Sequence, residues 1–355
     1  MKIKVLMIGP DRSVHGGISG VVNNYYEAGL DRKVDLYYIG TMVDGSKFRK
    51  LGQAIKAYLL FLIKLSGYDI VHVNMASDSS YYRKSVFIRT AKAFRKKIVI
   101  HQHGGNFREF YTEELSERGR KNLKKVFSMG DILLVLGSVW KEFFAAMVDE
   151  EKITVLSNSI VIPEYPEKKY GFYKILFLGR LCKEKGIEEL LTVMPKLRET
   201  CPDVHLYLGG VWEDKGLKDK ATGLASCVTD LGWIGKEEKK KYLQECDIFV
   251  LPSYFEGQPV SILEAMTYAC GIVTTDTGSI PDMITDRQTG LLISPGDAKA
   301  LESSLLTMLT DTELCRQLGE NARRKVEKDF SIEDNIKKLL DIYEKMVQKE
   351  RSPEA

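Results

Sequence analysis

The stretch YKILFLGRLCKEKGIEELLTVMPKLRET, residues 173–200, joins two patterns of hydrophobicity. Its first part, YKILFLG, is a short apolar run that ends at a glycine, which is typical of a buried strand. Its second part, GIEELLTVMPKLRET, repeats apolar residues at the period of a helix. Strands that alternate with helices of about ten to fifteen residues form parallel sheets covered on both faces. The stretch therefore predicts an α/β fold.

The same alternation extends over both halves of the chain. In the second half, further strand candidates are VHLYLGG, VTDLGWI, CDIFVLPS, CGIVTTD and TGLLISP. The first half contains KIKVLMIG, VDLYYIG, YDIVHVN, KKIVIHQHG, DILLVLG and KITVLSN. Two sets of about six strands, with helical patterns between most of them, predict two doubly wound, Rossmann-like domains.

The length of 355 residues also favours two domains, because a domain typically has about 150 residues. Prolines, charges and a glycine cluster between strands in residues 159–174, where we place the boundary. We expect an N-terminal domain over residues 1–165 and a C-terminal domain over residues 170–330. The tail over residues 331–350 predicts one amphipathic helix, for which Ser331 is a suitable N-cap.

Composition is that of an ordinary soluble globular protein, with 44% hydrophobic and 28% charged residues. The longest apolar run, AYLLFLI over residues 57–63, is far shorter than the roughly 20 residues that span a bilayer. The N-terminal MKIKVLMIGPDR is interpreted as a first strand and not as a signal peptide, so we expect a cytoplasmic protein. Six cysteines are scattered singly, which favours reduced thiols over a zinc site.

Charge is distributed unevenly along the chain. Residues 1–160 carry 25 Lys/Arg against 16 Asp/Glu, a net +9, and the remainder carries 27 against 33, a net −6. A basic first half suggests a polyanionic neighbour, either nucleic acid or an anionic membrane. The chain has neither an aromatic and basic platform nor helix-turn-helix spacing, so nucleic acid is not expected.

Two basic stretches of the first half show helical spacing of apolar residues. They are FRKLGQAIKAYLLFLIKLSG and YYRKSVFIRTAKAFRKK. One interpretation is two surface helices with apolar faces on the sheet and cations in water; the other is a surface that lies on an anionic leaflet. The protein could thus be peripheral on the inner face of the membrane. The apolar positions of the first stretch are Phe48, Leu51, Ile55, Tyr58, Leu62 and Leu65.

In doubly wound sheets, ligands bind beyond the carboxyl ends of the strands. After the first strand, Gly16 and Gly17 open a helix whose N-terminus suits a phosphate, although a plain turn is an equal alternative. Neither GxGxxG nor a P-loop is present. After the fourth strand, His103 is a candidate substrate contact or a structural histidine. His101 shares its face, but no third residue completes a metal site.

Two cations follow the strand of the opening stretch. Arg180 comes directly after it, and Lys185 precedes Gly186 and the new helix. A guanidinium fork and a flexible ammonium at such a position suit a diphosphate. Taken alone, the pair fits two solvated surface cations better than a diphosphate site.

The stretch YFEGQPVSILEAM, residues 254–266, contains two glutamates. Gly257 and Pro259 predict that Glu256 lies in a loop and Glu264 in the following helix. The pair is a poor match to a glycosidase dyad, whose carboxyl groups lie about 5–10 Å apart. The helix mouth would bind an anion and the two acids neutral hydroxyls, as in a nucleotide sugar; the alternative is a capped surface helix. The backbone N–H donors of that mouth are expected from Gln258, Val260 and Ser261.

These motifs resemble those of a known family. EGQPVSILEA resembles the E-x7-E motif of retaining glycosyltransferases of family 4, and GRLCKEKG resembles their G-R-L-x-x-x-K-G motif. HQHGGNF is similar to the family's His-Gly strand end, and FSIEDN to the start of its terminal helix, which crosses back to the N-terminal domain. The resemblance covers almost the whole chain and is strongest from about residue 174 to 295. LSNSIV departs from the Asn-Gly turn of many relatives.

The resemblance implies a GT-B fold, in which two Rossmann-like domains face a central cleft. It also implies roles for particular residues. Arg180 and Lys185 would hold the diphosphate and Glu264 the ribose, while Glu256 would bind the transferred sugar. Gly16 and Gly17 would close over the phosphates, Trp233 and Ile234 would contact the base, and His103 would lie near the sugar and the leaving group.

The expected function is transfer of a sugar, with retention, from a nucleotide diphosphate sugar to a hydroxyl acceptor. UDP is expected from its frequency in the family, and a lipid-linked glycan of cell-surface polysaccharide synthesis is the expected acceptor. No DxD pair is present, so no metal or other cofactor is expected. Two alternatives are a sugar-nucleotide epimerase of the same fold and a non-catalytic partner subunit.

Overall fold

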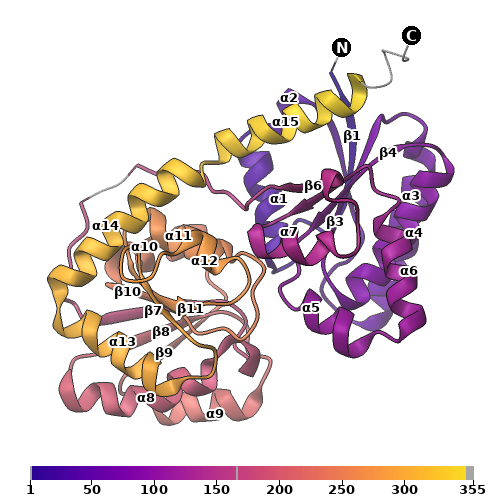
Figure 1. The fold of residues 1–355 in the computed structure, drawn as a ribbon. Helices are drawn as coiled ribbons and strands as arrows, with labels where there is room; N and C mark the ends of the chain where they lie inside the picture. The colour runs from indigo at the N-terminus through magenta and orange to yellow at the C-terminus, as the bar shows by residue number, and fades with distance from the viewer. Residues whose placement is uncertain (1, 165–166, 349–355) are drawn as a thin grey trace. The chain divides into compact units, whose positions relative to one another are not determined.

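The computed structural model describes residues 2–164 and 167–348, which form two compact units. Unit 1 comprises the chain up to Val161 together with the segment from Ser331, and unit 2 comprises Ile162–Phe330. Figure 1 shows that each unit has its own sheet with helices around it. The predicted end of the first domain at residue 165 lies outside the described residues, as do residues 349 and 350 of the predicted terminal helix.

Unit 1 contains a six-stranded sheet of order β2-β1-β3-β4-β5-β6, in which every pair is parallel. The chain moves to one side of β1 with β2 and to the other side with β3, so the topological switch point lies between β1 and β3. The strands are β1 (Lys4–Gly9), β2 (Asp35–Gly40), β3 (Ile70–Met75), β4 (Lys97–Gln102), β5 (Ile132–Val135) and β6 (Ile153–Val155).

Helices cover both faces of this sheet. One apolar cluster joins Ile98 and Ile100 of β4 to Tyr81 and Ile88 of the helix that follows β3. On the other face, the last helix contributes Tyr343, whose hydroxyl lies 2.5 Å from His72 Nδ1. The helices of unit 1 are α1 (Gly17–Glu27), α2 (Leu30–Lys33), α3 (Lys47–Leu65), α4 (Asp78–Ala93), α5 (Phe107–Glu109), α6 (Glu117–Phe127), α7 (Ser138–Ala145) and α15 (Ile332–Gln348).

Helix α3 does not have the single apolar face that its spacing predicts. Leu65 is buried and Tyr58 packs against the core, whereas Phe48, Leu51 and Ile55 are exposed to solvent. The helix turns Ala57, Phe61 and Leu65 inward. A second apolar face therefore remains on the surface, because the helix carries more large apolar side chains than the sheet can cover.

Unit 2 contains a six-stranded parallel sheet of order β12-β11-β10-β7-β8-β9. Its switch point lies between β7 and β10, which are neighbours in the sheet but distant in the chain. The strands are β7 (Lys174–Leu178), β8 (His205–Gly209), β9 (Val228–Gly232), β10 (Ile248–Leu251), β11 (Gly271–Thr275) and β12 (Leu291–Ile293). The helices are α8 (Ile187–Thr200), α9 (Lys215–Gly223), α10 (Lys236–Glu245), α11 (Val260–Thr267), α12 (Ile280–Met283), α13 (Ala298–Thr310) and α14 (Thr312–Asp329).

The prediction of two parallel-sheet, Rossmann-like domains is confirmed by these two sheets. All six cysteines are buried, and none pairs with another described residue in a disulfide. Within residues 2–164 and 167–348, no group of three His, Cys, Asp or Glu side chains could hold a metal ion. No helix in the same part of the chain is long and apolar enough to cross a membrane.

Candidate functional site

The candidate residues of unit 2 lie at the carboxyl ends of its strands. In either unit, we call the edge of the sheet at which the strands end the carboxyl edge. The loops after β7 and β10 meet there because Gly186 has no side chain. Its φ is +70°, and a Cβ at this position would lie 2.1 Å from the carbonyl oxygen of Pro252. Glycine is therefore required both for the backbone conformation and for the close approach of the two loops.

This approach brings Lys185 and Glu256 into contact, although 71 positions separate them. Lys185 Nζ lies 2.5 Å from Glu256 Oε1, and the two side chains are only 17% and 10% exposed. The family resemblance implies that Lys185 binds a diphosphate and Glu256 a sugar. In the structure, each is neutralised by the other, so an anion bound by Lys185 would share it with Glu256.

Glu264 has a similar partner. It lies in the middle of α11, and its carboxylate forms an ion pair with Lys239 Nζ of α10. Glu256 and Glu264 thus each form an ion pair with a lysine from another element. Lys239 was missed in the sequence analysis because it belongs to the charged run KEEKKK, which has the appearance of a solvated helix face.

Arg180 differs from Lys185 in its exposure. Its Nη1 lies 2.8 Å from Glu213 Oε2, and the arginine side chain is 56% exposed. An exposed pair of this kind contributes little to stability, since solvent screens both charges. Arg180 is therefore available to exchange Glu213 for a more highly charged ligand.

The N-terminus of α11 lies a few residues after Glu256 in the chain. Helix α11 begins at Val260, follows Pro259 and has no side-chain cap, so the first-turn N–H groups of Val260 and Ser261 point out of the helix end. Gln258 is buried just before them. As predicted, Glu256 lies in the loop and Glu264 in the helix.

Two buried serines were missed in the sequence analysis. Ser279 N donates to the Gly257 carbonyl oxygen at 2.9 Å, so the loop after β11 packs against the Glu256 loop. The hydroxyl groups of Ser253 and Ser279 are buried and have no hydrogen-bond partner among the described residues. Their only signal in the sequence is a serine shortly after a buried strand, which is too common to be selective.

Trp233 and Ile234 follow β9, the strand at one end of the sheet order. Gly232 has a φ of +63° and turns the chain at the strand end. Trp233 is exposed, whereas Ile234 is buried and lies close to Gly209 at the end of β8. The exposed indole is thus presented near the carboxyl edge and offers a flat surface for an aromatic ligand.

In unit 1, the two predicted glycines open a helix as expected. Gly16 has extended backbone, and α1 begins at Gly17. A Cβ added at either glycine would meet no atom within 4 Å, so packing within the chain does not require glycine there. The space beside these two Cα atoms is therefore open.

His103 follows β4 and is neutral at physiological pH. Its Nε2 lies 3.0 Å from Asn74 Oδ1, and its ring centroid lies 4.0 Å from that of His101. Burial, with smaller effects from His72 and Lys84, lowers the pKa of His103 to about 3. The Asn74 oxygen can only accept, so Nε2 of the neutral ring carries the proton. His103 can therefore act through hydrogen bonds and not as a cation.

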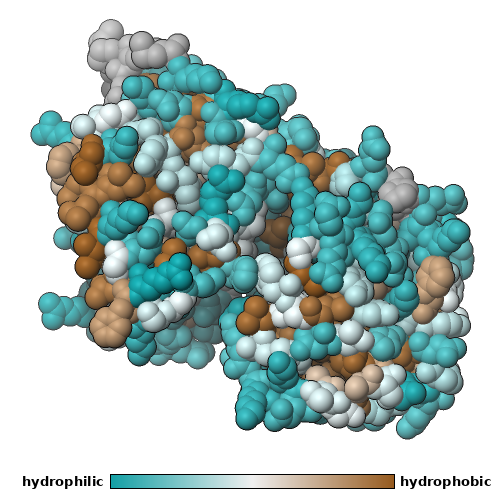
Figure 2. Space-filling view, turned by 180° about the vertical axis from the view of Figure 1, so that it is seen from behind, coloured by the Kyte–Doolittle hydropathy of each residue, from teal (hydrophilic) through white to brown (hydrophobic). Residues whose placement is uncertain are grey.

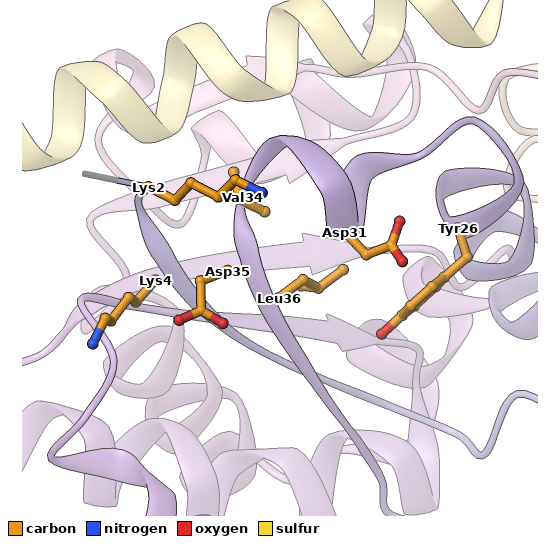
Figure 3. A pocket seen from close by; sticks show the side chains of 7 residues that line it. All are labelled: Lys2, Lys4, Tyr26, Asp31, Val34, Asp35 and Leu36. Atoms are coloured by element: carbon orange, nitrogen blue, oxygen red, sulfur yellow. The ribbon is translucent and has the colours of Figure 1, made fainter.

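A surface hollow of about 540 Å³ lies elsewhere in unit 1 (Figure 3). Its lining includes Lys4 and Asp35, which start β1 and β2, so the hollow lies at the amino ends of these strands. Ligands of parallel doubly wound sheets bind at the opposite ends. We therefore assign no function to this hollow.

Two parallel Rossmann-like units, each with its polar residues after the strands, define a GT-B type fold. Sucrose-phosphate synthase from Thermosynechococcus elongatus matches with a TM-score of 0.81 at 18% identity, over 98% of this chain and 100% of that structure. Anabaena Alr3699/HepE, solved with UDP and glucose, matches with a TM-score of 0.77 at 17% identity, over 97% and 100%. At such identities the similarity establishes the fold alone.

Residues 162–325, which make up unit 2 apart from its last five residues, match the protein-family model described as Glycosyl transferases group 1. The amylovoran biosynthesis glycosyltransferase AmsK of Erwinia amylovora is 28% identical over 73% of this chain and 66% of its own length. Glycogen synthase of Mycobacterium tuberculosis is 26% identical over 57% and 51%. The chain thus spans between about half and two thirds of the length of these curated relatives.

Proposed function

We propose that this protein is a retaining glycosyltransferase of family 4, which moves a sugar from a nucleotide diphosphate sugar to a hydroxyl acceptor. The observation that carries the proposal is the Lys185–Glu256 pair at the switch point between β7 and β10. This pair lies beside the uncapped mouth of α11, within the region that matches the group 1 family model. A cation, an acid and the first-turn N–H groups of a helix in one place suit a diphosphate that carries a sugar.

The proposed chemistry is electrostatic. Arg180, Lys185 and the N–H groups of Val260 and Ser261 would stabilise the negative charge that the diphosphate gains as its bond to the sugar breaks. The donor's other parts would be bound by Glu264 at the ribose, by Trp233 and Ile234 at the base, and by Glu256 at the sugar hydroxyls. Gly16 and Gly17 are assigned to the phosphates and His103 to the sugar and leaving group. No metal is required in this scheme.

We propose UDP as the nucleotide. The support comes from Alr3699/HepE, whose similar fold has been solved with UDP and glucose. A donor screen tests the proposal: sugar nucleotides of uridine, guanosine and adenosine are supplied, and release of free UDP, GDP or ADP is measured. UDP release is expected. An isomerised sugar nucleotide without nucleotide release would indicate an epimerase, and no binding of any donor would indicate a non-catalytic subunit.

We further propose that the acceptor is lipid-linked and that unit 1 docks on an anionic membrane. Helix α3 exposes large apolar residues, among them Phe48 at 88% and Ile63 at 73%. Cations interrupt this face at Lys47, Arg49 and Lys56, and the helix contains no acidic residue. Figure 2 shows a hydrophobic area on the side of the molecule where unit 1 carries α3. An apolar face with cations around it fits an anionic leaflet.

A further inference from the structure

Lys84 is a buried cation that has no counter-charge among the residues that the structure describes. It lies in the second turn of α4, its side chain is almost inaccessible at 1% exposure, and it makes neither a hydrogen bond nor an ion pair with any residue in 2–164 or 167–348. A buried charge without a partner is costly, so folded proteins normally pair it or bind something to it.

The geometry of α4 directs Lys84 towards the carboxyl edge of unit 1. The helix begins at Asp78, shortly after β3 ends at Met75, so its N-terminus lies at this edge. Side chains of a helix tilt towards its N-terminus, and the chain of Lys84 therefore extends towards the ends of β3 and β4. The carboxyl edge is where doubly wound sheets bind their ligands.

A further polar side chain without a partner among the described residues lies on the face of the sheet that α4 covers. Ile98 and Ile100 of β4 pack in one cluster with Tyr81 and Ile88 of α4. Strand alternation places Gln102 on this same face, near the strand end. Gln102 is buried, and both its amide nitrogen and its amide oxygen lack a hydrogen-bond partner within the described ranges.

Arg83 is a second cation beside Lys84. Its Nε is buried without a partner among the described residues, and its Nη1 makes only a 3.4 Å contact with Ser79 Oγ. Burial, followed by the charge of Arg83, lowers the pKa of Lys84 to about 7. Asp78, at the start of α4, hydrogen-bonds Glu114, which raises the pKa of Glu114, and neither acid forms an ion pair with Arg83 or Lys84 among the described residues.

We propose that Lys84, Arg83 and the Gln102 amide bind a phosphate or diphosphate group of the acceptor. This proposal rests on the proposed glycosyl transfer, and it gives the acceptor a chemical class. Two cations adjacent in the chain, without a carboxylate partner in the described part of the chain, match a multiply charged phosphate better than a singly charged carboxylate. A lysine ammonium is a common phosphate ligand, and the amide nitrogen supplies a neutral donor.

The test is calorimetric titration with inorganic pyrophosphate. The background is the Arg180→Ala/Lys185→Ala double variant, which removes the cations of the proposed donor site. In this background Lys84→Met should weaken pyrophosphate binding by about tenfold or more, as expected for loss of one charge-assisted bond. Lys92→Met is the matched control, because Lys92 lies on the same helix but is exposed, and it should change binding less than about twofold. If the double variant does not fold, the titration is repeated with wild-type protein whose donor site is saturated with UDP.

Three outcomes would overturn the proposal. They are equal affinities in Lys84→Met and Lys92→Met, tighter binding of glucuronate than of pyrophosphate, and a lower melting temperature of Lys84→Met without ligand. The last would mean that the ammonium stabilises the fold, whereas a site built for an absent anion predicts a higher melting temperature when the charge is removed. UDP binding by the wild type reports on the donor site separately. If the wild type binds UDP but the double variant binds no pyrophosphate, only the proposed phosphate site at Lys84 is refuted.

Discussion

At the scale of single residues, Arg180 and Lys185 are the clearest test of the donor site. Replacing either with alanine should weaken binding of UDP much more than binding of uridine, because each cation is expected to bind phosphate. A charge-assisted hydrogen bond contributes about 1.5–3 kcal/mol, or roughly ten- to hundredfold in affinity. Calorimetry with UDP and uridine measures both losses. Lys299→Ala, an exposed lysine of the same unit, is the control, and equal losses for the two ligands would refute the phosphate assignment.

The two glutamates should respond differently to the same substitution. Glu256→Gln should reduce turnover while UDP affinity stays within about threefold, since Glu256 is assigned to the sugar. Glu264→Gln should weaken UDP itself by about tenfold, the value of one hydrogen bond to a charged group. Steady-state kinetics and UDP titration separate these effects. The reverse pattern would mean that the two roles are exchanged.

The lysines that pair with Glu256 and Glu264 also affect the stability of these two variants. Each substitution leaves Lys185 or Lys239 with an uncharged neighbour in a partly buried position. A loss of stability of about 1–3 kcal/mol is therefore expected for either variant. Melting temperatures should be measured first, so that assays are made well below them.

At the scale of elements, buried histidines join β3 and β4 to the terminal helix α15. His72 Nδ1 contacts the Tyr343 hydroxyl at 2.5 Å, and His72 Nε2 lies 3.3 Å from His101 Nδ1. Burial lowers the pKa of His72 to about 3 and that of His101 well below its usual value. Both rings are therefore neutral in the folded protein at physiological pH.

These pKa values predict a loss of stability in mild acid. Between the usual histidine pKa of about 6.5 and about 3, the unfolded chain binds protons that the folded chain cannot. The free energy of unfolding should thus fall as pH drops below about 6.5, by up to about 1.4 kcal/mol per pH unit for each buried histidine. The difference between the melting temperatures at pH 7.5 and pH 5.5 measures this loss of stability. His101→Gln should reduce this difference and His15→Gln, at an exposed residue, should not; equal differences in both variants would contradict the assignment.

At the scale of the whole molecule, the exposed apolar face of α3 predicts vesicle binding. The protein should sediment with vesicles rich in phosphatidylglycerol at low salt and release at high salt, because salt screens the attraction of the cations. Phe48→Ser/Ile63→Ser should weaken this binding by at least about tenfold, since two exposed apolar side chains no longer enter the interface. Val211→Ser, at an exposed residue of unit 2, is the control. Failure of the wild type to sediment would favour a soluble acceptor.

The sequence by itself determined the fold class and the positions of most candidate residues. Apolar runs that alternate with helical patterns predicted two parallel Rossmann-like sheets, and both sheets are present. Gly257 and Pro259 predicted that Glu256 lies in a loop and Glu264 in a helix, which the structure confirms. These signals are local, since a turn or a helical period is encoded within a few neighbouring residues.

Only the tertiary structure decided which side chains meet. Lys185 contacts Glu256 because β7 and β10 are neighbours in the sheet, and Lys239 of α10 contacts Glu264 of α11 across 25 positions of the chain. The same applies to the exposed face of α3, for which the spacing of residues left two interpretations open, and to Lys84, which is buried without a hydrogen bond or ion pair among the described residues. Periodicity shows that a helix has an apolar face, but the order of strands and the area of the sheet determine what that face covers, and both depend on contacts between residues far apart in the chain.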